Sequence, residues 1–137
     1  MFTGSINTKL NQLIHHSTSK NIQNSLPTHL VWKDWCRGTH CFPSGRDKSW
    51  NINFGMVYGD LIKSATVYFK ADNGGNLSIN GTYIGYTHNT YNGSGTAFNV
   101  GAIFKLGTNN ISVSVHDDDS PASDNQIGYQ VDIYLRY

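Results

Sequence analysis

One stretch of the sequence decides the fold, residues 64–87, which read SATVYFKADNGGNLSINGTYIGYT. In its first part Ala65, Val67 and Phe69 alternate with more polar residues. Side chains on a β-strand point to opposite faces in turn, so this period of two indicates a strand with one buried face. The stretch therefore predicts a sheet that packs against something on one side only.

A hairpin signal follows in the same stretch. Asn80-Gly81 separates two strand-like runs, residues 76–80 and 83–87. Both central residues of a type I′ turn need positive φ, which Asn and Gly adopt at least cost. The pair therefore predicts a two-residue turn between antiparallel strands.

The same alternation recurs on both sides of this stretch. It is found in four further runs, residues 50–54, 97–100, 111–115 and 129–135, with turns expected at 72–75 and 106–110. Seven or eight short strands at this spacing leave no room for βαβ units. We expect an all-β fold of antiparallel sheets, with Trp32 and Trp35 in the core or covering a sheet.

Composition limits the possible partners. The formal net charge is +1, charged residues make up 14%, and Lys and Arg form no cluster, so we expect no nucleic-acid partner. No apolar run approaches the roughly 20 residues that cross a bilayer, so we expect no membrane insertion.

The chain divides by composition near residue 27. Residues 1–27 are polar and are predicted to form an extended N-terminal arm, whereas residues 28–137 carry the strand pattern of a single binding domain. The N-terminus lacks the basic and apolar regions of a signal peptide. An arm of this kind suits contact with copies of the chain or with other assembly proteins, at an extracellular surface or in a virion.

The two cysteines, Cys36 and Cys41, enclose four residues. This spacing permits a disulfide-closed loop or two free thiols, and His40 beside Cys41 adds a metal alternative. A tetrahedral zinc site needs a second pair of ligands, which the neighbouring sequence lacks. A disulfide or free thiols are therefore favoured over zinc.

Five segments follow one another in the order of a known fold: ATVYFKADN (65–73), LSINGTYIG (77–85), FNV (98–100), LGTNNISVSV (106–115) and GYQVDIYL (128–135). In this they resemble the galactose-binding-domain-like jelly roll of carbohydrate-binding modules and of accessory domains in glycoside hydrolases. The resemblance implies an antiparallel jelly-roll β-sandwich that often binds sugars and sometimes a structural calcium ion. It covers about residues 65–137 and says little about the ligand, because one fold hosts many functions.

Sugar recognition needs an aromatic face for the C–H side of the ring and polar groups for its hydroxyls. A polar loop and a strand end supply both, and we expect the ligand-binding residues to be Tyr86, His88, Asn89, Tyr91, Asn92, His116 and Asp118. The alternative is a solvated loop whose Asn and Gly residues only satisfy turn geometry.

The acidic run after residue 116 offers a second site. Asp117, Asp119 and Asp124 supply the hard oxygen ligands that calcium prefers, although the spacing is not that of an EF-hand. A flexible acidic loop at a strand end is the alternative.

Catalysis is not expected. Glycoside hydrolysis needs two carboxyl groups facing each other across a cleft, and neighbouring loop carboxylates rarely do so. The sequence also lacks the nucleophile elbow, the zinc-protease motif and the phosphate loop. We expect a non-catalytic carbohydrate-binding or adhesive module that recognises glycans through loops at one end of a sandwich, or else a structural protein of a virus particle or surface assembly.

Overall fold

The computed structural model describes residues 26–37, 47–118 and 126–137. They form eight strands: β1 (His29–Arg37), β2 (Asp47–Met56), β3 (Ser64–Asp72), β4 (Gly74–Ile79), β5 (Thr82–His88), β6 (Thr96–Val100), β7 (Gly107–His116) and β8 (Gln126–Arg136). The described part contains no α-helix, only a 3-10 turn at Gly59–Leu61, and hence no helix of the length and apolarity that span a bilayer.

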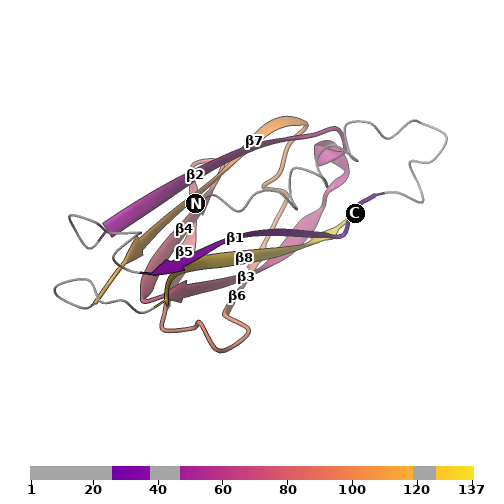
Figure 1. Cartoon of the computed structure of the whole chain (residues 1–137). Helices are drawn as coiled ribbons and strands as arrows, with labels where there is room; N and C mark the ends of the chain where they lie inside the picture. Colours follow the sequence, from indigo (N-terminus) through magenta and orange to yellow (C-terminus); the bar gives the residue numbers. More distant parts are fainter. Residues whose placement is uncertain (1–25, 38–46, 119–125) are drawn as a thin grey trace.

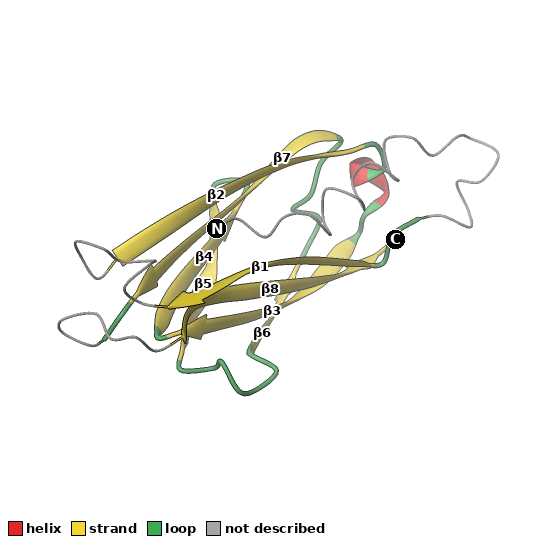
Figure 2. Ribbon diagram, viewed as in Figure 1, coloured by secondary structure: helices red, strands yellow, loops and turns green. Residues whose placement is uncertain are grey.

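The strands lie in two four-stranded antiparallel sheets packed face to face (Figure 1, Figure 2). Sheet A has the order β1-β8-β3-β6 and sheet B the order β2-β7-β4-β5. The pairs β1·β8, β2·β7, β3·β6 and β4·β5 are nested like one long hairpin wrapped around itself, which is the jelly-roll arrangement. The predicted all-β antiparallel sandwich is confirmed.

The core is formed by the inward face of each strand, in the period of two expected from the sequence. On β3 the residues Ala65, Val67 and Phe69 are buried, with polar neighbours between them. Strands β2, β7 and β8 alternate in the same way, because each has one sheet face against the other sheet and one against water. Trp32 is fully buried in this core, whereas Trp35 is only half-buried.

The structure confirms one of the turns predicted from the sequence and shows that another was wrong. Asn80 and Gly81 have φ of 49° and 80° and form the expected hairpin turn between β4 and β5. The turn expected at 106–110 is wrong for most of its length, because β7 begins at Gly107 and pairs with Met56 at the end of β2. The run Gly107-Thr-Asn-Asn110 has the composition of a turn. It is extended because it pairs with the end of β2.

A polar group lies inside the core between the two sheets. Asp34 of β1 is buried and accepts a hydrogen bond of 2.9 Å from the indole Nε1 of Trp50 on β2. The ring of Trp50 also packs on Tyr129 of β8, with centroids 4.9 Å apart. Burial raises the pKa of the Tyr129 hydroxyl, and the charge of Asp34 raises it further. Among the described residues this buried hydroxyl has no hydrogen-bond partner.

Tyr129→Phe is therefore expected to stabilise the protein by about 1 kcal/mol, because it removes a desolvated hydroxyl whose hydrogen bond is not made. Urea unfolding at neutral pH measures the change. Tyr134→Phe, on the outer face of the same strand, is the matched control and should change the free energy of unfolding little. A loss of stability in Tyr129→Phe would contradict this description of the core.

Tyr137 is hydrogen-bonded to the segment just before β1. The Tyr137 hydroxyl donates a hydrogen bond of 2.6 Å to the carbonyl oxygen of Pro27. Burial raises the pKa of Tyr137 to about 12, and Tyr58 adds to the rise. The folded state therefore holds this proton more tightly than the unfolded state does.

The stability that this proton contributes is present below pH ~10, the pKa of an unfolded tyrosine, and is lost as pH rises towards 12. We expect the stability difference between the natural chain and Tyr137→Phe to shrink between about pH 9 and about pH 11. Urea unfolding of both proteins at the two pH values tests this. A constant difference would show that the Tyr137 phenol titrates alike in both states.

Candidate functional site

The strand ends that flank four chain connections lie at one end of the sandwich. Strands β1, β3, β5 and β7 end there and β2, β4, β6 and β8 begin there, as the antiparallel registers require. The shortest connection is a single residue, Asn73, between β3 of sheet A and β4 of sheet B. We call this the Asn73 end. The sequence predicted that binding loops would gather at one end of the sandwich, and the connections from β5 and β7 do meet here.

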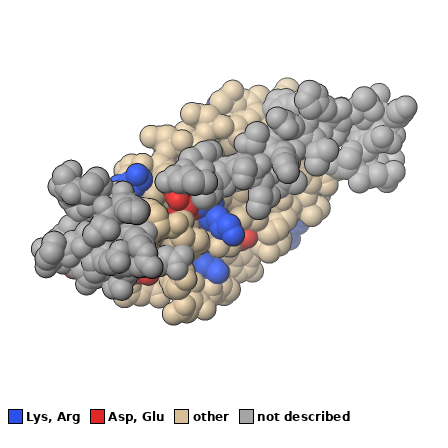
Figure 3. Space-filling model, in the orientation of Figure 1, with Lys and Arg blue, Asp and Glu red and all other residues tan. Residues whose placement is uncertain are grey.

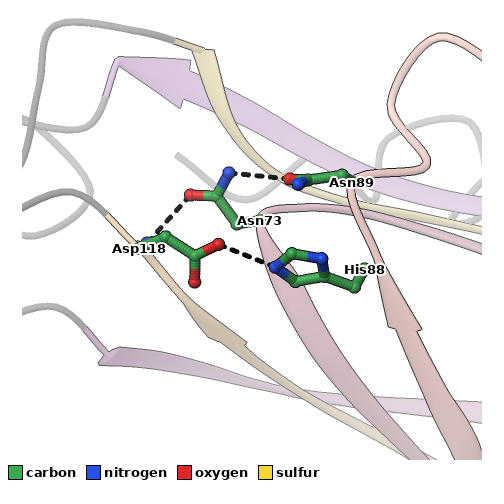
Figure 4. A network of polar contacts seen from close by, with 4 residues as sticks. All are labelled: Asn73, His88, Asn89 and Asp118. Carbon is green, nitrogen blue, oxygen red and sulfur yellow. Dashed lines mark hydrogen bonds and ion pairs between the residues drawn. The ribbon is translucent and has the colours of Figure 1, made fainter.

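Asn73 joins two of these connections through its amide side chain (Figure 4). Its Nδ2 donates to Oδ1 of Asn89 at 2.8 Å, and its Oδ1 accepts from the backbone N–H of Asp118 at 2.9 Å. The Asp118 carboxylate in turn lies 2.7 Å from Nε2 of His88. Residues from three connections therefore form one polar network.

The network is open to water. The side chains of His88 and Asp118 are 41% and 45% exposed. A second histidine–aspartate pair, His116 with Asp47 at 2.8 Å, is also exposed, and its aspartate is more exposed than Asp118. Exposed pairs of this kind contribute little to stability, typically ~0–1 kcal/mol. Their hydrogen-bonding atoms are thus accessible to a ligand at small cost to the fold.

An aromatic platform adjoins the network. The Tyr86 side chain is 52% exposed, and its ring lies nearly parallel to that of His88, with centroids 6.2 Å apart. The tyrosine lies over Gly74 of the neighbouring strand, where a Cβ would come within 2.7 Å of its hydroxyl oxygen. A glycine at this position therefore gives the Tyr86 ring the space it occupies.

The outer face of sheet B continues the site away from this end. The strand registers place its outward side chains in three rows that cross β2, β7, β4 and β5 in turn. The rows are Asp47, His116, Gly74 and His88; then Ser49, Ser114, Asn76 and Tyr86; then Asn51, Ser112, Ser78 and Tyr83. Each row ends on a ring of β5.

Tyr83 reaches the outer face because of a β-bulge. The register between β4 and β5 shifts at Leu77/Ser78, which leaves Ile84 without a partner of its own. A bulge changes which face the following residues point to. Tyr83 is consequently exposed and donates a hydrogen bond of 2.9 Å to Oδ1 of Asn76.

Small polar side chains line a shallow hollow beside these rings. It measures about 220 Å³. Its polar lining residues, which we call the serine–asparagine face, are Ser49, Asn51, Asn76, Ser78, Ser112 and Ser114. All six are uncharged hydroxyl or amide groups, so this face can both donate and accept hydrogen bonds.

The predicted ligand residues separate into two groups. Tyr86, His88, Asn89 and Asp118 lie together at the network or beside it, and His116 lies in the same row as His88. The ring of Tyr91 packs nearly perpendicular to that of Trp35 on β1, with centroids 5.1 Å apart, and Asn92 is exposed in the β5–β6 connection.

Sequence reasoning missed the residues that complete the site. Asn73 looked like a turn residue, and the serines and asparagines of β2, β4 and β7 looked like ordinary outward positions. Only the pairing of strands distant in the sequence brings them together. The one available signal was the concentration of Ser and Asn, without charge, at the outward positions of these strands.

The calcium prediction falls mostly outside the described residues, which exclude Asp119 and Asp124. Asp117 is fully buried and Asp118 is exposed, so these neighbouring carboxylates do not share one surface. The described part of the chain holds no group of three or more Asp, Glu, His or Cys side chains placed to bind a metal. A calcium site in this loop stays a prediction.

Cys36 at the end of β1 is disulfide-bonded. The only other cysteine of the sequence, Cys41, lies outside the described residues.

Comparison with known proteins finds likeness in structure alone. No protein-family model matches the chain, and no curated protein is significantly similar to it. Among solved structures it is similar to β-glucuronidase from Ruminococcus gnavus in complex with D-glucaro 1,5-lactone (13% identity, TM-score 0.42) and with uronic deoxynojirimycin (13%, 0.43). A further crystal structure of that enzyme has 11% identity and a TM-score of 0.41.

Each of these matches covers 66% of this chain and 20% of the enzyme chain. A likeness of this size carries no argument about fold or function. The resemblance to galactose-binding domains stays a prediction.

The network predicts how one substitution would act. Asn73→Ala removes the acceptor for the Asp118 amide, so that this N–H should exchange with solvent markedly faster, while the core strands stay protected. Hydrogen exchange followed by NMR measures it amide by amide. Asn99→Ala, on the outer face of sheet A, is the control. Unchanged exchange at Asp118 would contradict the role assigned to Asn73.

Proposed function

We propose that this domain is a non-catalytic carbohydrate-binding module that holds a neutral oligosaccharide at the Asn73 end and along the outer face of sheet B. One observation supports it most directly. An exposed aromatic ring, Tyr86, lies beside a polar network whose carboxylate, amide and imidazole groups are accessible to water. This combination of a ring and fixed polar groups is what sugar recognition needs.

The polar groups match the hydroxyls of a sugar. The Asp118 carboxylate is an acceptor and the Asn89 amide has both donors and acceptors. Asn73 already holds both residues in place, so that binding would not have to order them first. A hydroxyl pair on one sugar ring could bridge these two side chains.

The outer face of sheet B favours a chain over a single sugar. Rows of side chains on one strand face recur every two residues, about 6.6 Å apart. Tyr83, Tyr86 and His88 thus offer rings in three consecutive rows beside the serine–asparagine face. Several sugar units could bind along β5, each with a ring on one side and hydroxyl or amide groups on the other.

Charge favours a neutral ligand. The serine–asparagine face carries no ionised group, and the two histidine–aspartate pairs place each carboxylate beside an imidazole. Charged side chains of the described residues are also scattered rather than gathered on the face seen in Figure 3. Such a surface has little long-range attraction for a polyanion.

Each such site is open and shallow, so we expect weak binding, with a dissociation constant on the order of 1 mM. Several copies acting together would raise the avidity. The predicted association through residues 1–27 stays a prediction, because residues 1–25 lie outside the described part of the chain. The surface or virion location and the alternative role in a particle also stay predictions.

The test is an NMR titration of the full chain with neutral oligosaccharides, with and without calcium. Tyr86→Ala should weaken binding about tenfold, because it removes the ring on which the sugar rests. Gly74→Ala should also weaken it, since its Cβ displaces the far end of Tyr86. Leu106→Ala, an exposed residue at the opposite end, should bind normally.

Amides of β4, β5 and β7 near Tyr86 and Asp118 are expected to shift during the titration. If no oligosaccharide shifts them, the proposal is wrong. It is equally wrong if Tyr86→Ala and Leu106→Ala bind alike.

A further inference from the structure

The opposite sheet carries a larger hollow. It lies on the outer face of sheet A and measures about 610 Å³, within the ~300–1,000 Å³ of small-molecule sites. The described residues that line it are Thr66, Tyr68, Lys70, Ser94, Asp132 and Tyr134. They come from β3, β8 and the β5–β6 connection, and none belongs to the site on sheet B.

Two tyrosines form a corner of this hollow. The rings of Tyr68 and Tyr134 stand at 90° with centroids 5.8 Å apart. Tyr134 is 46% exposed, and one face of its ring is covered by His29 of β1, which stacks on it at 4.3 Å. Tyr134 is thus held in position while part of its ring remains open to a ligand.

A carboxylate is fixed beside the tyrosines. The Asp132 side chain is only 15% exposed, far less than those of Asp118 and Asp47 at the Asn73 end. Its Oδ1 lies 2.9 Å from Nε2 of His29, and its Oδ2 accepts from Nε2 of Gln130 at 2.7 Å. Each carboxylate oxygen has a further lone pair, so both can still accept a hydroxyl proton from a ligand.

The charged side chains that line the hollow have opposite signs. Lys70 lines it together with Asp132, so one positive and one negative side chain face the same space. The Thr66 hydroxyl is held loosely, donating to Oδ1 of Asn99 at 3.2 Å, and the Ser94 hydroxyl adds a further donor and acceptor. Hydroxyl-rich neutral rings suit this lining better than strongly charged molecules do.

We propose that this hollow is a second, independent sugar site that binds one terminal pyranose unit. The ring would rest against Tyr134 and Tyr68, and two neighbouring hydroxyls would donate to the Asp132 carboxylate. The inference goes beyond the function proposed above, since it needs neither the Asn73 end nor the serine–asparagine face. Together the two sites would let one domain hold two glycans on opposite faces.

Cross-strand packing is the other explanation of these side chains. Tyr134 pairs with both His29 and Thr66 across the sheet, and such pairs stabilise sheets without any ligand. Packing accounts for the stacked rings. It does not require an orienting pair of donors on Asp132 or a hollow of this size.

The experiment is an NMR titration of the isotopically labelled full chain with the methyl glycosides of galactose, glucose and N-acetylglucosamine. At least one should shift the amides of β3 and β8 around Tyr68 and Asp132. Asp132→Asn and Tyr134→Ala should each weaken this binding by about tenfold or more, because one loses a charged acceptor and the other a ring. Leu106→Ala should leave it unchanged.

Thermal unfolding checks that the variants fold, and Thr66→Val replaces either one that does not. If none of the three glycosides shifts these amides, or if the variants bind as tightly as the natural chain, the hollow is not a sugar site. Tyr86→Ala tells the two proposals apart. It should abolish shifts around the Asn73 end and leave those of β3 and β8 intact, so either site can fail alone.

Discussion

The chain crosses from one sheet to the other within a single residue, and the rest of the structure depends on that corner. Asn73 alone separates β3 of sheet A from β4 of sheet B. The corner is tight enough that a Cβ on Gly75 would lie 2.7 Å from the Cβ of Ala71 and 2.8 Å from the Phe69 ring. Two sheets joined this closely must bring the neighbouring connections to the same place.

The corner also explains why the polar network forms where it does. The backbone of Asn73 donates to the His116 carbonyl oxygen at 3.3 Å, and its own carbonyl accepts from Asn89 at 3.0 Å. With its side-chain bonds, this one residue contacts the connections that leave both β5 and β7. The same residue thus closes the sandwich and arranges His88, Asn89 and Asp118. Asn73 therefore serves both the connection between the sheets and the candidate site.

The two outer faces differ in the chemistry they present. Sheet B offers small neutral groups with rings along one edge strand, whereas sheet A offers a larger hollow with a fixed carboxylate beside two tyrosines. A jelly roll needs only that outward positions tolerate water, so the fold leaves both faces free to vary. That freedom means that the fold by itself carries no information about the ligand.

The sequence by itself determined the strands and the sandwich, because a period of two is a local property that each strand carries. It also determined the Asn80-Gly81 turn. The polar loop that it predicted from Tyr86 onward begins only at Asn89, because Tyr86 and His88 belong to β5. Only the tertiary structure decided the rest. The β-bulge that exposes Tyr83 lies within the β4–β5 hairpin and was not predicted from its sequence. The link from Asn73 to Asp118 and the hollow around Asp132 depend on strand pairs far apart in the sequence. Register between such strands is set by the packing of the whole core, and no single segment encodes it.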